Sequence, residues 1–124
     1  MFEHSTPFSG FSVDDIQAAQ QFYGKTLGLA VSESNGLLEV SLGSARVVVY
    51  PKANHTPATF TILNFPVKDI DRAVTQLVEA GVHFEVYPDG NLKTDERGIF
   101  RGRGPTIAWF RDPAGNFLSV IETT

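Results

Sequence analysis

The sequence contains no cysteine among its 124 residues. Disulfide bonds, thiolate metal ligands and a cysteine nucleophile are therefore excluded. Long hydrophobic runs are also missing, because no stretch approaches the roughly 18 apolar residues of a spanning helix. Residues 1–10 lack the basic and apolar regions of a signal peptide. We therefore expect a cytoplasmic protein with no membrane partner.

Positive charge is scarce as well. Ten lysines and arginines stand against fourteen acidic residues, which gives a formal net charge of -4. Nucleic-acid-binding proteins concentrate basic side chains to neutralise phosphates, so this balance argues against nucleic acid as a partner. The one basic segment, residues 93–104, also contains Asp95, Glu96 and three glycines. That composition favours a solvated loop or a contact with a small anion.

The remaining composition is that of an ordinary globular protein, with 42% hydrophobic and 11% aromatic residues. A chain of this length has room for one domain, which would bury about two thirds of the surface exposed by the unfolded chain. We therefore predict one domain over residues 1–124.

The chain contains an internal repeat. The segment FSVDDIQAAQQFY (residues 11–23) aligns with FPVKDIDRAVTQL (residues 65–77) after a shift of 54 residues. In each copy an aspartate precedes apolar residues that recur every three or four positions, which predicts a capped amphipathic helix. Asp14 or Asp15 would cap the first helix, and Asp69 would cap the second.

Short segments rich in β-branched and aromatic residues follow each helix, and turn residues separate them. Each helix would end at a glycine, Gly28 or Gly81. The predicted strands are residues 29–34, 37–43 and 45–51 in the first half, and residues 82–88, 106–112 and 116–122 in the second. Each half is therefore predicted as strand, helix, strand, strand, strand.

Two βαβββ modules of this kind predict an α+β fold. We place module 1 at about residues 1–51, a proline-containing linker at residues 52–58 and module 2 at about residues 59–124. One such module leaves a face of its sheet uncovered, so two copies favour mutual burial or a shared concave surface.

These motifs resemble the glyoxalase/bleomycin resistance protein/dioxygenase superfamily, also called the vicinal oxygen chelate superfamily. The resemblance rests on VDDIQAAQQFYGKTLGL (residues 13–29) and FRDPAGNFLSVIE (residues 110–122), and it covers nearly the whole chain. It implies a cup-shaped, mostly antiparallel sheet with the helices outside. It also implies a divalent metal ion at the floor of the cup in metal-dependent members, and pairing into homodimers.

The resemblance further implies where metal ligands would lie, namely at Phe8, Val48, Ile62 and Ser119. Three of these side chains have no lone pair, and a neutral serine hydroxyl replaces a carboxylate poorly, whereas Zn²⁺, Mn²⁺ and Ni²⁺ favour imidazole and carboxylate ligands. We therefore expect no metal and no other cofactor, and we assign no catalytic residue.

Without a metal, the predicted function is sequestration of a small, hydrophobic organic molecule in the cup. Alternation along the strands and the resemblance together place the candidate ligand-binding residues on the inner face. These are Phe8, Ser12, Val48, Tyr50, Ile62, Asn64, Trp109, Phe117 and Ser119. The acidic balance mildly favours a cationic ligand. Of the adjacent Trp109 and Phe110, one would face the cup and the other would pack beneath the helices.

Several alternatives stay open at this stage. The inner-face side chains could simply fill the interior as core. A metal-dependent lyase or dioxygenase with displaced ligands is a second possibility: His83 and Glu85 would share one face of a strand, although no third ligand is evident. A dimerising interaction module without a ligand is a third. Glu122 is interpreted as a solvent-facing or edge charge at the C-terminus, and residues 87–104 are long enough for a lid.

Overall fold

The computed structural model describes residues 1–123 of the chain. The chain divides into two compact units, Met1–Thr56 and Pro57–Thr124, which we call unit 1 and unit 2. The boundary lies inside residues 52–58, the segment that the sequence marks as a linker. The assignment of residues 1–124 to one domain stays a prediction.

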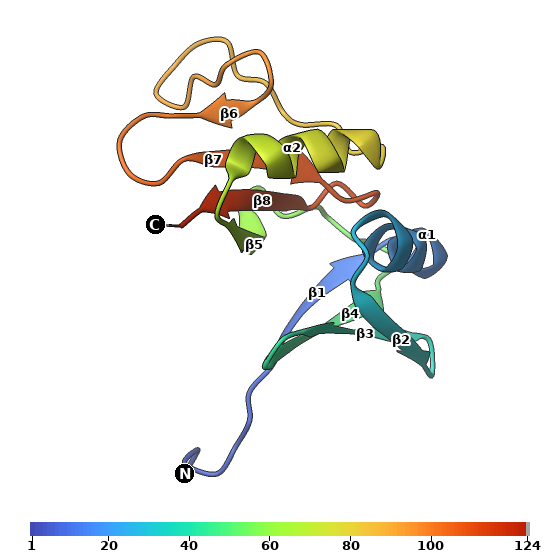
Figure 1. The fold of residues 1–124 in the computed structure, drawn as a ribbon. Coiled ribbons are helices and arrows are strands. Elements are labelled where there is room, and N and C mark those ends of the chain that lie inside the picture. Colours follow the sequence, from blue (N-terminus) through green and yellow to red (C-terminus); the bar gives the residue numbers. More distant parts are fainter. Residues whose placement is uncertain (124) are drawn as a thin grey trace. The chain divides into compact units, whose positions relative to one another are not determined.

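Unit 1 contains one short helix and one four-stranded sheet (Figure 1). Its elements are β1 (Ser9–Val13), α1 (Ile16–Gln21), a π-helical turn η1 (Phe22–Thr26), β2 (Ala30–Ser34), β3 (Leu37–Leu42) and β4 (Ala45–Pro51). The sheet order is β1-β4-β3-β2, with β1 parallel to β4 and the other pairs antiparallel.

Unit 2 repeats this arrangement with a longer helix. Its elements are β5 (Thr61–Val67), α2 (Ile70–Glu79), β6 (Ile99–Phe100), β7 (Ile107–Arg111) and β8 (Phe117–Glu122). The sheet order is β5-β8-β7-β6, with β5 parallel to β8 and the other pairs antiparallel. In Figure 1, α2 lies across β7 and β8. The predicted α+β class and the two βαβββ modules are confirmed.

The predicted helix ends are also found. Asp15, and not Asp14, caps α1, because its Oδ1 accepts hydrogen bonds from the backbone of Gln17 and Ala18. Asp69 caps α2 by accepting from the Arg72 amide at 3.1 Å. The chain turns away after each helix through a glycine with positive φ, 71° at Gly28 and 101° at Gly81.

The strand predicted at residues 82–88 is wrong. This segment forms only an isolated bridge between Phe84 and Phe110, and the first strand after α2 is instead the two-residue β6. Pro88 cannot donate to a sheet ladder, and Gly90 has a φ of 92°. The segment therefore leaves the sheet early and continues as a long loop.

The hydrophobic core of each unit lies between its helix and one face of its sheet. In unit 1 the fully buried side chains include Tyr23, Leu38 and Val49; in unit 2 they include Ile70 and Phe110. No helix of the same unit, among residues 1–123, covers the opposite face of either sheet.

None of the helices described in residues 1–123 has the length and apolar character needed to cross a bilayer.

Candidate functional site

The helix-free face of the unit 2 sheet carries four of the candidate residues. Ser119 on β8 lies between Trp109 on β7 and Asn64 on β5, its partners in the strand registers. Phe117 is two residues before Ser119 and therefore shares its face. Phe110 is fully buried on the opposite face, so Trp109 is the residue of this pair that faces outward.

A pocket of about 360 Å³ lies on this face. It is lined by Thr59, Phe60, Thr61, Tyr87, Leu92, Trp109 and Phe117. Two of its apolar side chains are largely in water, with 69% of Phe60 and 51% of Leu92 exposed. The pocket is therefore an aromatic concavity that is open to solvent.

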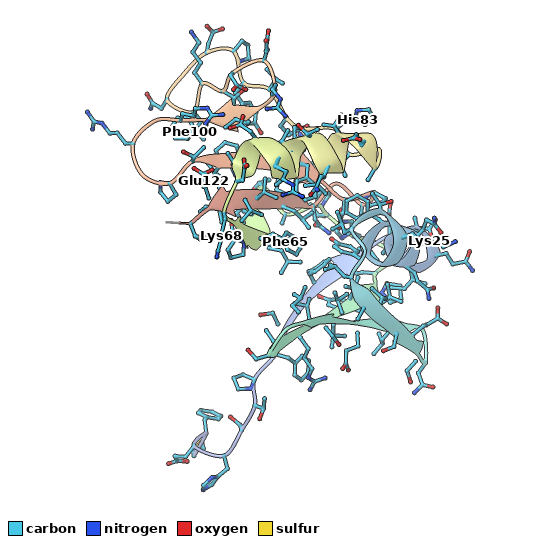
Figure 2. All side chains as sticks on the ribbon, in the orientation of Figure 1. Lys25, Phe65, Lys68, His83, Phe100 and Glu122 are labelled. Carbon is cyan, nitrogen blue, oxygen red and sulfur yellow. The ribbon has the colours of Figure 1, made fainter. Side chains whose placement is uncertain are left out.

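Two neighbouring rings hold the Trp109 indole. The centroid of the Tyr87 ring lies 6.1 Å from that of Trp109 at an interplanar angle of 64°, and the Phe100 ring lies 6.3 Å away at 38°. Both distances fall within the range at which tilted and edge-to-face aromatic pairs attract one another. Figure 2 shows Phe100 on β6, beside the loop. These contacts fix the orientation of Trp109 in the pocket.

A closed loop brings Tyr87 and Leu92 to the pocket. The Tyr87 amide donates to Thr94 Oγ1 at 2.9 Å, and the Thr94 amide donates to the Tyr87 carbonyl at 2.8 Å. The Thr94 hydroxyl in turn donates to the Asp95 carbonyl, and Thr94 is buried. Residues 87–94 are thus fastened at their base, while the role of residues 87–104 as a lid stays a prediction.

Charged groups lie beside the pocket but do not line it. Arg111 donates to Glu85 Oε1 at 2.9 Å, and its guanidinium carbon lies 4.5 Å from the centroid of the Phe117 ring. Burial raises the pKa of the Tyr87 hydroxyl, the Glu85 charge raises it further, and Arg111 opposes the shift. The lining itself is uncharged and suits an uncharged ligand surface.

A hydrogen-bonded pair adjoins the aromatic residues. The fully buried Ser119 hydroxyl donates to Asn64 Oδ1 at 2.6 Å, while Asn64 itself is exposed. The strict alternation that would place Ile62 beside Asn64 is interrupted by a shift of register between Thr61 and Leu63. Thr61 takes the position opposite Phe117. Of the unit 2 candidates, Trp109 and Phe117 line the pocket, whereas Ile62, Asn64 and Ser119 do not.

The other four candidates belong to unit 1 and share the sheet face opposite the buried side chains of β4. Val48 is the register partner of Gly10, and Tyr50 is that of Ser12. The Ser12 hydroxyl lies 2.6 Å from Nδ1 of His55. Phe8 is 53% exposed, with the Arg46 guanidinium carbon 4.2 Å from its ring centroid.

These positions bear on the alternative that the inner-face residues are simply core. Phe8 is exposed, while Val48 and Ile62 are half-buried and do not belong to the fully buried set. Ser119 is fully buried, yet its side chain contacts an exposed polar residue. Within each unit, these candidates therefore lie at the margin of the core.

The donors present do not fit the metal that the resemblance implies. No group of three or more imidazole and carboxylate side chains gathers anywhere in residues 1–123. Ser119 already donates its hydroxyl proton to Asn64, and Glu85 pairs with Arg111. His83 lies just beyond the end of α2 (Figure 2) and is part of no such group in the described residues.

Two further charges have structural partners. Glu122 is half-buried and its Oε2 accepts from the Ile70 amide at 2.9 Å, at the start of α2 (Figure 2). Because β8 is also an inner strand of its sheet, the interpretation of Glu122 as a solvent-facing or edge charge is wrong. From the basic segment, Arg97 and Arg101 donate to Asp71 Oδ1 at 3.0 and 2.7 Å, which ties the exposed loop to the helix.

Tyr87, Leu92, Phe60, Thr59 and Thr61 line the pocket but were not among the candidate residues. The signal available for the first two was the unusual length of the loop after α2, because binding residues concentrate on such loops. The signal for the others was their position at the start of β5.

A family model described as the Glyoxalase/Bleomycin resistance protein/Dioxygenase superfamily matches residues 7–120. No curated protein matches the chain. Among solved structures, a glyoxalase family protein from Enterococcus faecalis is 24% identical with a TM-score of 0.71, and the match covers 98% of this chain and 100% of that chain.

Two other solved structures cover nearly the full length of both chains. An antibiotic binding protein from a Streptomyces species is 21% identical over 98% of each chain, with a TM-score of 0.68. A lactoylglutathione lyase from Agrobacterium tumefaciens is 21% identical over 97% of this chain and 95% of that chain, also with a TM-score of 0.68. At these identities the likeness shows the fold. The family match, over tandem βαβββ modules, places the chain in the Glyoxalase/Bleomycin resistance protein/Dioxygenase superfamily.

Proposed function

We propose that this chain is a small-molecule-binding protein that holds an uncharged, hydrophobic aromatic ligand in the unit 2 pocket. The observation that carries the proposal is the convergence of Phe60, Tyr87, Trp109 and Phe117 on one open concavity of about 360 Å³. This volume lies at the lower end of the range of roughly 300–1,000 Å³ typical of ligand sites. Because the protein would bind the ligand without catalysing a reaction, its function would be to sequester the ligand.

Exposed apolar surface supplies the driving force. Each Å² of apolar surface removed from water contributes about 25 cal/mol, and Phe60 and Leu92 leave most of their surface in water. A flat ring placed against the Trp109 indole would gain stacking in addition to burial. The antibiotic binding protein of similar fold shows that this architecture can serve binding. The uncharged lining supports a neutral ligand rather than the cationic one that the overall charge favours.

The alternative of a metal-dependent lyase or dioxygenase has no donor cluster in residues 1–123 to support it. Elemental analysis of protein purified without chelator tests it, because a stoichiometric metal would require displaced ligands. The homodimer and the cytoplasmic location stay predictions, and light scattering after size-exclusion chromatography tests the first. Ligand contacts at Phe8, Ser12, Val48 and Tyr50 stay predictions as well.

The central experiment is a titration with N-phenyl-1-naphthylamine, an uncharged aromatic dye whose emission rises in apolar surroundings. Trp109 is the single tryptophan of the chain, so energy transfer from its emission to the dye reports binding to the chain, and variants of the lining residues locate the site. We expect saturable binding of one dye per chain. Replacement of Trp109 by alanine should weaken the dye affinity by tenfold or more, measured by dye emission, which corresponds to about 1.4 kcal/mol.

A matched pair of variants supplies the control. Phe60→Ala and Phe2→Ala each remove a largely exposed phenyl ring, with exposed fractions of 69% and 76%, but only Phe60 lines the pocket. We expect weaker dye binding in the first variant alone. Equal effects of the two variants, or dye binding that never saturates, would overturn the proposed site.

A further inference from the structure

The buried hydroxyl of Ser119 fixes the orientation of an exposed amide. Ser119 has no exposed surface, and its Oγ lies 2.6 Å from Asn64 Oδ1. Hydrogen bonds of the O–H···O type have lengths of about 2.7–2.8 Å, whereas N–H···O bonds are nearer to about 2.9–3.0 Å. The contact therefore joins the hydroxyl to the amide oxygen, and the Asn64 Nδ2 group is on the other side of the planar amide.

The Nδ2 group of Asn64 is consequently available as a donor. In residues 1–123 the only hydrogen bond of the Asn64 side chain is the one that its oxygen accepts from Ser119. Asn64 is an exposed residue, so solvent reaches its side chain. An acceptor atom that replaces water there would meet a donor whose direction is already set.

This donor lies in the same row of the sheet as the stacking residue. Asn64, Ser119 and Trp109 are register partners on β5, β8 and β7, three adjacent strands. Adjacent strands are about 4.7–4.9 Å apart, so the backbones of Asn64 and Trp109 are separated by roughly 10 Å. A molecule of two fused rings can cover this span with its ring against Trp109 and a polar end near Asn64.

The chemistry of the surroundings selects the kind of acceptor. The pocket lining contains no lysine or arginine, and the nearby Arg111 is paired with Glu85. A carboxylate or phosphate would therefore lose its hydration without a cation in compensation. A neutral carbonyl oxygen needs only the amide donor.

Resting on the proposed function, we propose that Asn64, which lies beside the pocket lining and not in it, is a specificity-determining residue for the ligand held there, and that the ligand is a neutral fused-ring aromatic molecule with a carbonyl group at one end. Ser119 is a positioning residue that acts through Asn64. Without its hydroxyl, the Asn64 amide could rotate and present either atom.

The test compares 2-acetylnaphthalene with 2-ethylnaphthalene, which share a ring system and differ by a carbonyl oxygen. Each compound competes with N-phenyl-1-naphthylamine, first on the unmodified protein and then on Asn64→Leu. Asn64→Leu should weaken the acetyl compound by about threefold to tenfold, the range that one neutral hydrogen bond gives, and should leave the ethyl compound unchanged or slightly tighter. This cycle isolates the hydrogen bond from differences in hydrophobicity.

Ser119→Ala provides a second, independent variant. It removes the hydroxyl that holds the Asn64 amide, without changing Asn64 itself. It should weaken the affinity for the acetyl compound by about twofold to threefold and leave the affinity for the ethyl compound unchanged. If both compounds bind but neither variant separates them, the Asn64 anchor is wrong and the binding function stands. If neither the dye nor the naphthalenes bind the unmodified protein, the proposed function fails and the anchor fails with it.

Discussion

The helix-free faces of the two sheets differ although the modules repeat the same order of elements. In unit 1 this face contains small and polar residues around Tyr50, such as Gly10, Ser12 and Glu39. In unit 2 the corresponding face carries Trp109 and an aromatic pocket. The repeated helix and strand pattern therefore supplies the scaffold in both units, while the residues on the uncovered face decide what each unit can bind.

The connection after the helix explains much of this difference. In unit 1, η1 ends at Thr26 and the next strand begins at Ala30; in unit 2, α2 ends at Glu79 and the next strand begins at Ile99. The longer segment contributes Tyr87 and Leu92 to the pocket. The long connection between α2 and β6 thus gives unit 2 two lining residues, and the short connection of unit 1 has no counterpart to them.

A glycine permits the loop to return beside its own beginning. A Cβ atom at Gly98 would lie 2.7 Å from the backbone oxygen of Glu85, and Gly98 has a φ of 87°. Both the contact and the positive φ exclude a larger residue without strain. The Gly98 amide donates to the Asp95 carbonyl at 3.1 Å, which completes the turn.

The largest expected effect comes from truncating one fully buried core side chain in either unit. Phe110→Ala in unit 2 should lower the free energy of unfolding by about 3–5 kcal/mol, and Leu38→Ala in unit 1 by about 2–5 kcal/mol, because both side chains are fully buried. Urea unfolding measures the loss, and amide hydrogen exchange locates it. We expect each variant to lose protection mainly in its own unit. Equal loss throughout for either variant would show that the chain unfolds as one cooperative structure.

The next effect concerns the hydrogen bonds between Tyr87 and Thr94 at the base of the unit 2 loop. Unit 1 has only a short connection after its helix. Thr94→Val keeps the shape of the side chain but removes the acceptor of the Tyr87 amide. The partly buried amide would then be unsatisfied, at a cost of about 1–2 kcal/mol. Limited proteolysis should cut residues 87–94 faster, and dye affinity should fall because Tyr87 and Leu92 lose their fixed positions. Unchanged cleavage and affinity would contradict the role of Thr94.

A smaller effect tests how each helix is held at its start. The start of α2 receives an acceptor from its own sheet, since Oε2 of Glu122 on β8 accepts from the Ile70 amide. Glu122→Gln removes the negative charge near the helix N-terminus and should cost about 0.5 kcal/mol in unfolding free energy. Roughly 1 M salt should reduce this difference by screening. A cost that persists in full at high salt would point to packing rather than charge.

The smallest effect is the ionisation of Tyr87. Burial holds its pKa above the ordinary value of 10.0, so the folded protein favours the protonated hydroxyl. The resulting stabilisation is present below this value and is lost as the pH rises through the raised pKa. Tyr87→Phe should therefore unfold less readily in strong alkali. Near-ultraviolet difference spectra of the two proteins give the midpoint, and a midpoint at or below 10.0 would refute the shift.

Local patterns in the sequence were sufficient for the helices and for most of the strands. The spacing of apolar residues after Asp15 and Asp69 specified both helices, because capping and amphipathic periodicity depend on residues within a few positions. The strands at residues 107–111 and 117–122 followed from the same kind of short-range signal. The repeat then predicted two modules, since each had to cover one face of its sheet.

The sequence by itself therefore determined the helices, most strands and the modular order. Tertiary structure decided that Trp109 faces outward while Phe110 is buried, that a bulge replaces Ile62 by Thr61 opposite Phe117, and that Ser119 bonds to Asn64. These outcomes depend on register between strands far apart in sequence, and a shift of one residue reverses the face of every side chain that follows. For this reason most of the scaffold could be predicted from local patterns, whereas the pocket took shape only when β5, β7, β8 and the loop were brought together.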